Sequence, residues 1–167
     1  MSQQQTGTGN YKGFLQTISI IHLAIIAGFA MATIFIANIL SGEFAPLSFT
    51  QKPKEFIIPI GLIGAIALGR FLGTSMLSKL KTKDTLQKKI ATFQTTHIIK
   101  IALLEIVGFA ALFTYTDTNN SFFLVMVALV LLMLISLFPT KGKIENAIPT
   151  STEDQSYLRN PEKPFGS

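Results

Sequence analysis

Five ionisable side chains lie within long apolar stretches of this 167-residue sequence: His22, Arg70, His97, Lys100 and Glu105. An ionisable group at membrane depth is costly and usually faces the protein interior or a partner group. Glu105 is the most demanding of the five, because its immediate neighbours are all aliphatic and a carboxylate has little reach. It must either pair with a cation or stay protonated, and both states are typical of proton-handling and ion-pair sites.

The other four residues allow more than one interpretation. Lys100 can extend toward the lipid head groups along its alkyl stem. Arg70 lies deeper, which favours an interior partner such as Glu105. His22 and His97 fall at similar depth on different helices, so they are either hydrogen-bonded packing residues or two axial ligands of a haem. In the haem interpretation, Arg70 and Lys100 would face the propionates.

Several kinds of chemistry have no residues to support them. The chain has no cysteine, which excludes disulfides, zinc–thiolate sites, iron–sulfur clusters and thiol catalysis. It has no acidic cluster for a metal and no serine with a nearby base on a membrane face. We therefore expect no enzymatic activity, no metal site and, apart from the haem alternative, no cofactor.

The hydropathy of the sequence predicts the helices that carry these residues. Charged residues make up 14% of the chain, whereas a soluble domain has about 25%. A helix needs roughly 20 apolar residues to cross a bilayer. Four segments qualify, at about residues 14–40, 56–78, 90–116 and 121–138. The sequence therefore predicts an all-α fold, an integral membrane four-helix bundle spanning residues 14–138.

The two ends of the chain have a different composition. Residues 1–13 are mostly polar and small, and residues 139–167 combine four prolines with many polar side chains. Segments of this kind bury too little apolar surface to order themselves. We predict a disordered N-terminal tail over 1–13 and a flexible cytoplasmic tail over 139–167.

The distribution of lysines predicts the orientation. Five lysines lie between residues 79 and 89, while the loop at 116–120 has none. Cytoplasmic loops carry an excess of Lys and Arg, so both termini are predicted to be cytoplasmic in a multi-pass protein of the bacterial inner membrane. The net charge of +5 is segregated in this way, and nucleic acid is not expected as a partner. Anionic lipid is a second interpretation of the lysine loop.

Small residues recur at four-residue steps on the first two predicted helices. Such ridges allow helix backbones to approach closely in lipid, so we expect them to face protein in the same or a neighbouring chain. The ridge residues are Ala24, Gly28 and Ala32 on the first helix, and Gly61, Ala65, Gly69 and Gly73 on the second.

One stretch resembles a known family. Residues 101–112, Ile-Ala-Leu-Leu-Glu-Ile-Val-Gly-Phe-Ala-Ala-Leu, resemble the carboxylate-bearing helix of the rotary-ATPase proteolipids, and the resemblance extends over the hairpin 61–115. It implies that Glu105 binds a transported proton. The family's Arg-Gln-Pro loop is missing, and Arg70 and Lys100 are additions. The whole chain also looks like small uncharacterised four-span bacterial membrane proteins with an Ala-Leu-Leu-Glu element in the third helix.

Three functions follow as alternatives. The first is a non-enzymatic membrane subunit or accessory protein in which the Glu105 region serves helix packing or a partner contact. The second is an oligomeric proton- or ion-linked translocator that uses Glu105. The third is a haem-binding membrane anchor that uses His22 and His97. The expected partners are the lipid bilayer and either further copies of the chain or other membrane proteins.

Overall fold

The computed structural model describes residues 9–40, 42–45 and 53–165, and these residues form helices joined by short connections, with no strand among them. The elements are α1 (Tyr11–Ile39), the short 3₁₀ helix η1 (Pro53–Phe56), α2 (Ile57–Leu77), α3 (Leu86–Thr118), α4 (Phe122–Ser136), α5 (Lys141–Ala147) and α6 (Thr152–Arg159). The predicted all-α class is confirmed.

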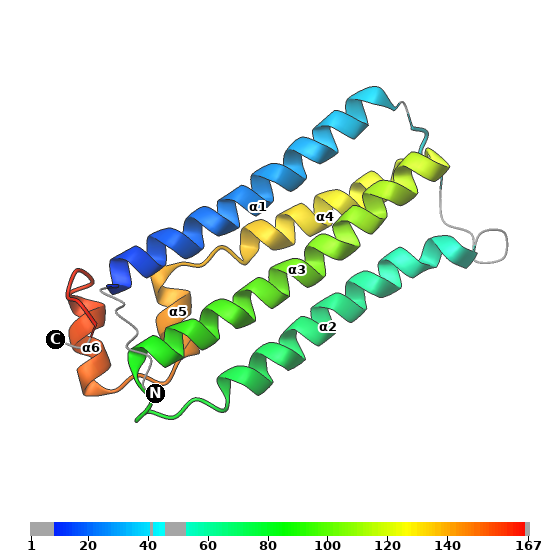
Figure 1. Cartoon of the computed structure of the whole chain (residues 1–167). Helices are drawn as coiled ribbons and strands as arrows, with labels where there is room; N and C mark the ends of the chain where they lie inside the picture. Colours follow the sequence, from blue (N-terminus) through cyan, green and yellow to red (C-terminus); the bar gives the residue numbers. More distant parts are fainter. Residues whose placement is uncertain (1–8, 41, 46–52, 166–167) are drawn as a thin grey trace, which may run out of the picture.

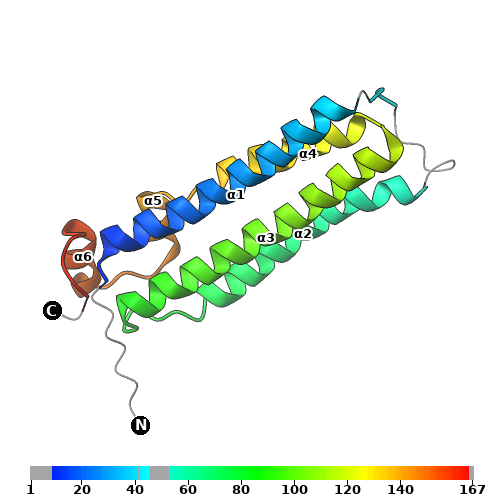
Figure 2. The ribbon, with the colours of Figure 1, turned by 45° about the horizontal axis from the view of Figure 1, so that its top comes forward.

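The four long helices run alternately up and down and form one elongated bundle (Figure 1). α3 is the central helix, because α1, α2 and α4 all pack against it, and α1 also packs against α4 (Figures 1 and 2). The main core fills the space between them with large apolar side chains that are almost fully buried. Its most buried members are Phe29, Ile101, Ala111, Leu112, Tyr115, Phe123, Val127, Val130 and Leu134.

Local signals explain where the helices begin and end. The side chain of Asn10 accepts a hydrogen bond from the Gly13 amide at 2.8 Å and caps α1. Thr85 caps α3, and its side chain accepts from the Lys88 amide. α3 ends at Asn119, whose φ of 52° lies in the left-handed region that asparagine tolerates better than most residues.

Helices α1, α2 and α3 are each long and apolar enough to cross a membrane. α4 has 15 residues, which is roughly 22 Å at 1.5 Å per residue and short of a bilayer's hydrocarbon core of about 30 Å. α4 and α5 together make a fourth candidate span, bent by 78° at the break between them. The helix α4 itself ends at Ser136, close to the predicted end of the fourth span at about residue 138.

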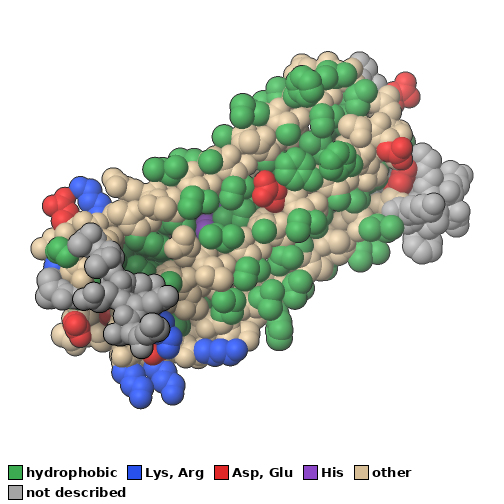
Figure 3. Space-filling view, viewed as in Figure 1, with side chains coloured by type: hydrophobic (Ala, Val, Ile, Leu, Met, Phe, Trp, Pro, Cys, Tyr) green, Lys and Arg blue, Asp and Glu red, His purple; other side chains and the backbone are tan. Residues whose placement is uncertain are grey.

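The outer surface of the bundle is apolar along most of its length. Figure 3 shows hydrophobic side chains over the visible face, with the lysines and arginines gathered at one end. Large side chains such as Phe35 and Phe71 are more than 65% exposed, as lipid-facing residues would be. A surface of this size and character suits a multi-pass membrane protein.

The C-terminal segment differs from the prediction. Residues 139–167 are predicted to be flexible, but α5 and α6 fold against the end of the bundle where α1 begins and α2 meets α3 (Figure 1). Ile144, Ile148, Tyr157 and Leu158 are buried there with Tyr11 and other apolar residues of the bundle. We call this end the basic end.

The prediction of a flexible tail was wrong because it rested on composition. The few apolar residues of this segment fall on one side of each short helix and meet an apolar surface already present on α1 and α3. Thr140 caps α5 and Ser151 caps α6. At the other terminus, residues 1–8 lie outside the described residues, and α1 begins at Tyr11, inside the predicted tail.

Candidate functional site

The small-residue ridge of α2 faces α3. A Cβ atom added to Gly73 would lie 2.6 Å from Cε and 2.8 Å from Nζ of Lys100, and one added to Gly69 would lie 3.4 Å from Cγ of the same lysine. Ala65 is buried on the same side, and Gly61 approaches Val107. The ridge thus brings α2 close to α3 and leaves a track in which the stem of Lys100 lies.

The ridge of α1 lies differently. Nothing comes within 4 Å of a Cβ added to Gly28, and Ala24 is exposed. Only Ala32 packs against the core. The expected protein contact along this ridge is therefore absent from the described part of this chain, and Ala24 and Gly28 face outward.

Glu105 lies on the outer face of α3, about midway along the helix. It borders a shallow groove with Ala102, Ile106, Phe109 and Phe113. It forms no hydrogen bond or ion pair with the residues that the structure describes. A partly buried carboxylate thus lies in an apolar setting on the outside of the bundle.

Arg70 is separated from Glu105. It is exposed on α2 and lines a cleft between α2, α3 and α4 together with Lys100 and Ser136. Among the described residues neither Arg70 nor Lys100 forms an ion pair. The Glu105–Arg70 pair considered from the sequence is therefore not formed, because the two side chains open onto different grooves.

The structure brings His22 and His97 together. Nδ1 of His22 lies 3.1 Å from Nε2 of His97, and both side chains are buried. Nε2 of His22 lies 2.9 Å from the carbonyl oxygen of Leu134 near the end of α4. The rings of Phe138 and His22 pack nearly at right angles, and Phe93 stacks on the His97 ring. The pair joins α1, α3 and α4 at one level.

The hydrogen-bond partners restrict the proton positions. A carbonyl oxygen can only accept, so Nε2 of His22 carries a proton and donates to Leu134. Nδ1 of a neutral His22 is then an acceptor, and Nε2–H of His97 donates to it. The resulting chain runs from His97 through His22 to the Leu134 carbonyl in the last turn of α4, which also accepts from the Leu137 amide at 3.1 Å.

This arrangement does not fit a haem. An iron bound by both imidazoles would lie between the two ligating nitrogens, with the porphyrin separating the rings. Here the facing nitrogens are at hydrogen-bond distance, and the second nitrogen of His22 is occupied by Leu134. Arg70 and Lys100 line a cleft of which neither histidine is part.

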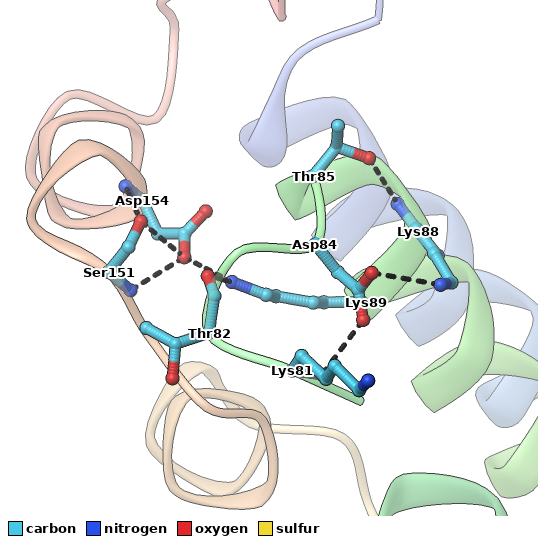
Figure 4. Close-up of polar contacts among 8 residues, drawn as sticks. All are labelled: Lys81, Thr82, Asp84, Thr85, Lys88, Lys89, Ser151 and Asp154. Carbon is cyan, nitrogen blue, oxygen red and sulfur yellow. Dashed lines mark hydrogen bonds and ion pairs between the residues drawn. The ribbon is translucent and has the colours of Figure 1, made fainter. Parts of the chain in front are cut away.

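A buried ion pair was missed from the sequence. Nζ of Lys89 lies 2.6 Å from Oδ2 of Asp154, with side-chain exposures of 0% and 5%. Nζ also donates to the carbonyl of Thr82 at 2.7 Å, and Oδ2 accepts from the backbone and hydroxyl of Ser151 (Figure 4). Burial alone would raise the pKa of Asp154, but these hydrogen bonds outweigh it and lower the pKa.

The lysine loop concealed this pair. In the sequence, Lys89 belongs to the group of five lysines that predicts the orientation, whereas in the structure its side chain is fully buried. Ser151 and Asp154, three residues apart, form a capping box at the start of α6. The spacing of Ser151 and Asp154 in the sequence could therefore have predicted a helix in the tail. The carboxylate of Asp84 does not cap a helix in this way, because it accepts from the Lys81 amide and the Lys88 side chain.

Comparisons with protein-family models, with curated proteins and with solved structures give no match. Within the described residues, no three His, Asp or Glu side chains gather as a metal ion would require. In the described part of the chain, the candidate sites are Glu105, the Arg70–Lys100 cleft and the histidine pair.

Proposed function

We propose that this chain is a non-enzymatic integral membrane subunit or accessory protein that binds a further transmembrane helix along the outer face of α3. One observation carries the proposal: Glu105 faces outward near the middle of an apolar helix and has no partner among the described residues. A carboxylate left in hydrocarbon is costly. A partner helix that donates a hydrogen bond or carries a cation would remove most of that cost.

The surroundings of Glu105 support close approach of such a helix. Ala102 and Ala110 flank it along the groove, and small residues allow backbones to come near one another in lipid. Phe109 and Phe113 border the same groove and offer apolar contact area. The expected partner therefore presents one polar or basic side chain within an otherwise apolar helix.

The setting that we propose is the bacterial inner membrane, with the basic end in the cytoplasm. Lysines are concentrated at the loop 78–85 and along α5, whereas Glu43 and Asp117 lie at the opposite end. This asymmetry follows the positive-inside rule. Both described chain ends would then be cytoplasmic.

A proton- or ion-linked translocator is the second candidate. The observation in its favour is again Glu105, a lone carboxylate on a glycine-packed hairpin and the residue that the resemblance to proteolipids implies as the proton carrier. In this case the occupant of the groove would be another copy of the chain. The two candidates therefore differ in the identity of the neighbouring helix.

The test is site-specific photocrosslinking in native membranes. A benzoylphenylalanine at Ala102 would sit in the Glu105 groove, and one at Ala67 would sit on an exposed position of α2 as the matched control. We expect a discrete protein adduct from position 102 that is lost when Glu105→Leu is added, and only lipid adducts from position 67. The crosslinked peptide should contain a basic or hydrogen-bond-donating residue.

The adduct also separates the candidates. An adduct with a different polypeptide supports the subunit proposal, and an adduct of twice the chain's own mass supports the translocator. Equal yields from positions 102 and 67, or an adduct unaffected by Glu105→Leu, would contradict both.

A further inference from the structure

The cleft between α2, α3 and α4 lies on a different face from Glu105. It has a volume of about 320 Å³ and is lined by nine residues, of which Arg70, Lys100 and Ser136 are polar. The apolar lining residues include Ala65, Leu104 and Met133. The cleft is therefore polar in one part and apolar in another.

The polar and apolar parts are ordered along the bundle axis. α2 and α4 run toward the basic end and α3 runs away from it (Figures 1 and 2). Arg70 follows Ala65, Lys100 precedes Leu104, and Ser136 follows Met133. On α2 and α3 the charged residue is therefore nearer the basic end than the apolar lining residues, and on α4 Met133 is nearer the middle than Ser136 and Leu137. A ligand that matches this order has a charged head and an apolar tail.

The charge of the cleft is positive and uncompensated. Among the described residues neither Arg70 nor Lys100 forms an ion pair. Lys143 adds a third cation near the same place, since its Nζ donates to the carbonyls of Ser136 at 2.6 Å and Phe138 at 3.1 Å. No carboxylate lines the cleft. Two cations within a membrane-spanning bundle call for an anion.

The packing of α2 on α3 holds one of these cations in position. The stem of Lys100 lies against Gly69 and Gly73, so the ammonium group is directed along the ridge toward the basic end. Arg70 is the residue next to Gly69 and brings a guanidinium with several donors, which suits phosphate oxygens. Besides allowing close packing, the ridge therefore places the side chain of Lys100 beside that of Arg70.

We propose that this cleft binds an anionic phospholipid, with the phosphate at Arg70 and Lys100 and an acyl chain along Leu104 and Met133. Basic pockets between transmembrane helices on the cytoplasmic side are known to take such head groups. The expected lipid carries a net negative charge, because its head group has a phosphate diester and no ammonium group. The proposal does not depend on a partner at Glu105.

The test uses the full-length chain purified in detergent and analysed by native mass spectrometry with phosphatidylglycerol, phosphatidylcholine or inorganic phosphate. We expect retained phosphatidylglycerol, little phosphatidylcholine and no effect of phosphate. Arg70→Gln with Lys100→Gln should weaken phosphatidylglycerol binding about tenfold to thirtyfold, as expected for removing two cations near an anionic lipid. The matched control, Lys79→Gln with Lys83→Gln, removes the same charge from the exposed loop and should have little effect.

Equal loss in the two double variants would overturn the proposal in favour of the lysine loop, and displacement of the lipid by inorganic phosphate would overturn the role of the acyl chain. A second measurement covers failure of the double variant to fold. Phosphatidylglycerol with a diazirine in its acyl chain, reconstituted with the unmodified chain, should label the peptide around Met133 more than the exposed peptide around Met31. Equal labelling of both peptides would contradict a bound lipid in the cleft.

Discussion

Lys89 at the start of α3 and Asp154 in α6 form an ion pair of 2.6 Å with almost no exposure of either side chain. The two residues are far apart in the sequence, and their contact attaches the C-terminal segment to the bundle. Beside the pair, Tyr157 and Leu158 of α6 are buried in one apolar cluster with Leu86 and Ile90 of α3. The end of the chain is therefore part of the folded structure.

Asp154→Asn should detach α6. Removing one partner of a buried ion pair leaves an uncompensated charge and destabilises by about 3–5 kcal/mol. We expect rapid proteolysis between α5 and α6 in the variant and slow proteolysis in the parent chain. Glu162→Gln is the control, since it breaks the exposed pair with Lys12, which should contribute little. Equal cleavage of the two variants would contradict a structural role for the buried pair.

The same contact should depend on pH. Burial acts to raise the pKa of Asp154, but the hydrogen bonds from Lys89 and Ser151 lower it overall. A carboxylate whose pKa is lower in the folded state contributes stability that is present above its unfolded pKa and lost as the pH falls through the folded value. NMR signals of the Leu158 methyl groups should therefore show α6 docked at neutral pH and released in acid. In Asp154→Asn this acid transition should be absent.

The bundle itself could be predicted because length and hydropathy decide it. An uncharged stretch such as 14–40 has few alternatives to a membrane helix, and α1 covers nearly the same residues. The level shared by His22 and His97 also follows from counting residues along antiparallel helices. Their direct hydrogen bond does not, because it depends on the rotation of each helix about its axis.

The sequence alone could have predicted that Lys100 and Glu105 lie on different faces of α3. Five residues correspond to about 500° of helix rotation, so the two side chains point roughly 140° apart and cannot share one groove. Which of them Arg70 would join depends on the packing of α2, set by Gly69 and Gly73. The docking of α6 could not be predicted from the sequence, since it depends on an apolar surface formed only when α1 and α3 have come together.

Gly73→Leu should disrupt the contact between α2 and α3. Even a Cβ at this position would meet the end of the Lys100 side chain, and a larger group would force the helices apart. We expect lower resistance to unfolding in mixed detergent, measured by circular dichroism. Gly28→Leu is the matched control on α1, because it has open space and should leave the isolated chain unchanged. Equal resistance in the two variants would mean that the α2 ridge does not hold the bundle together.

Glu105→Gln should leave the stability of the purified chain unchanged. The carboxylate has no partner within the described part of the chain, so its replacement strands no cation. The measurement is the same detergent unfolding curve, with Asp154→Asn as the destabilised reference. A loss as large as that of the reference would show that Glu105 pairs within the chain after all.

The histidine pair gives the last prediction. Replacing His22 by Phe keeps a ring against Phe138 but leaves the Nε2–H of His97 without an acceptor and the Leu134 carbonyl with the Leu137 amide alone, which should destabilise by about 1–3 kcal/mol. His97→Phe should have a smaller effect, since the bond from His22 to Leu134 remains. Because the two side chains bond each other, the double variant should lose less than the sum of the single losses. ¹⁵N NMR of the parent chain should show both rings as Nε2–H tautomers at neutral pH, and Nδ1–H on His22 would contradict the hydrogen-bond chain.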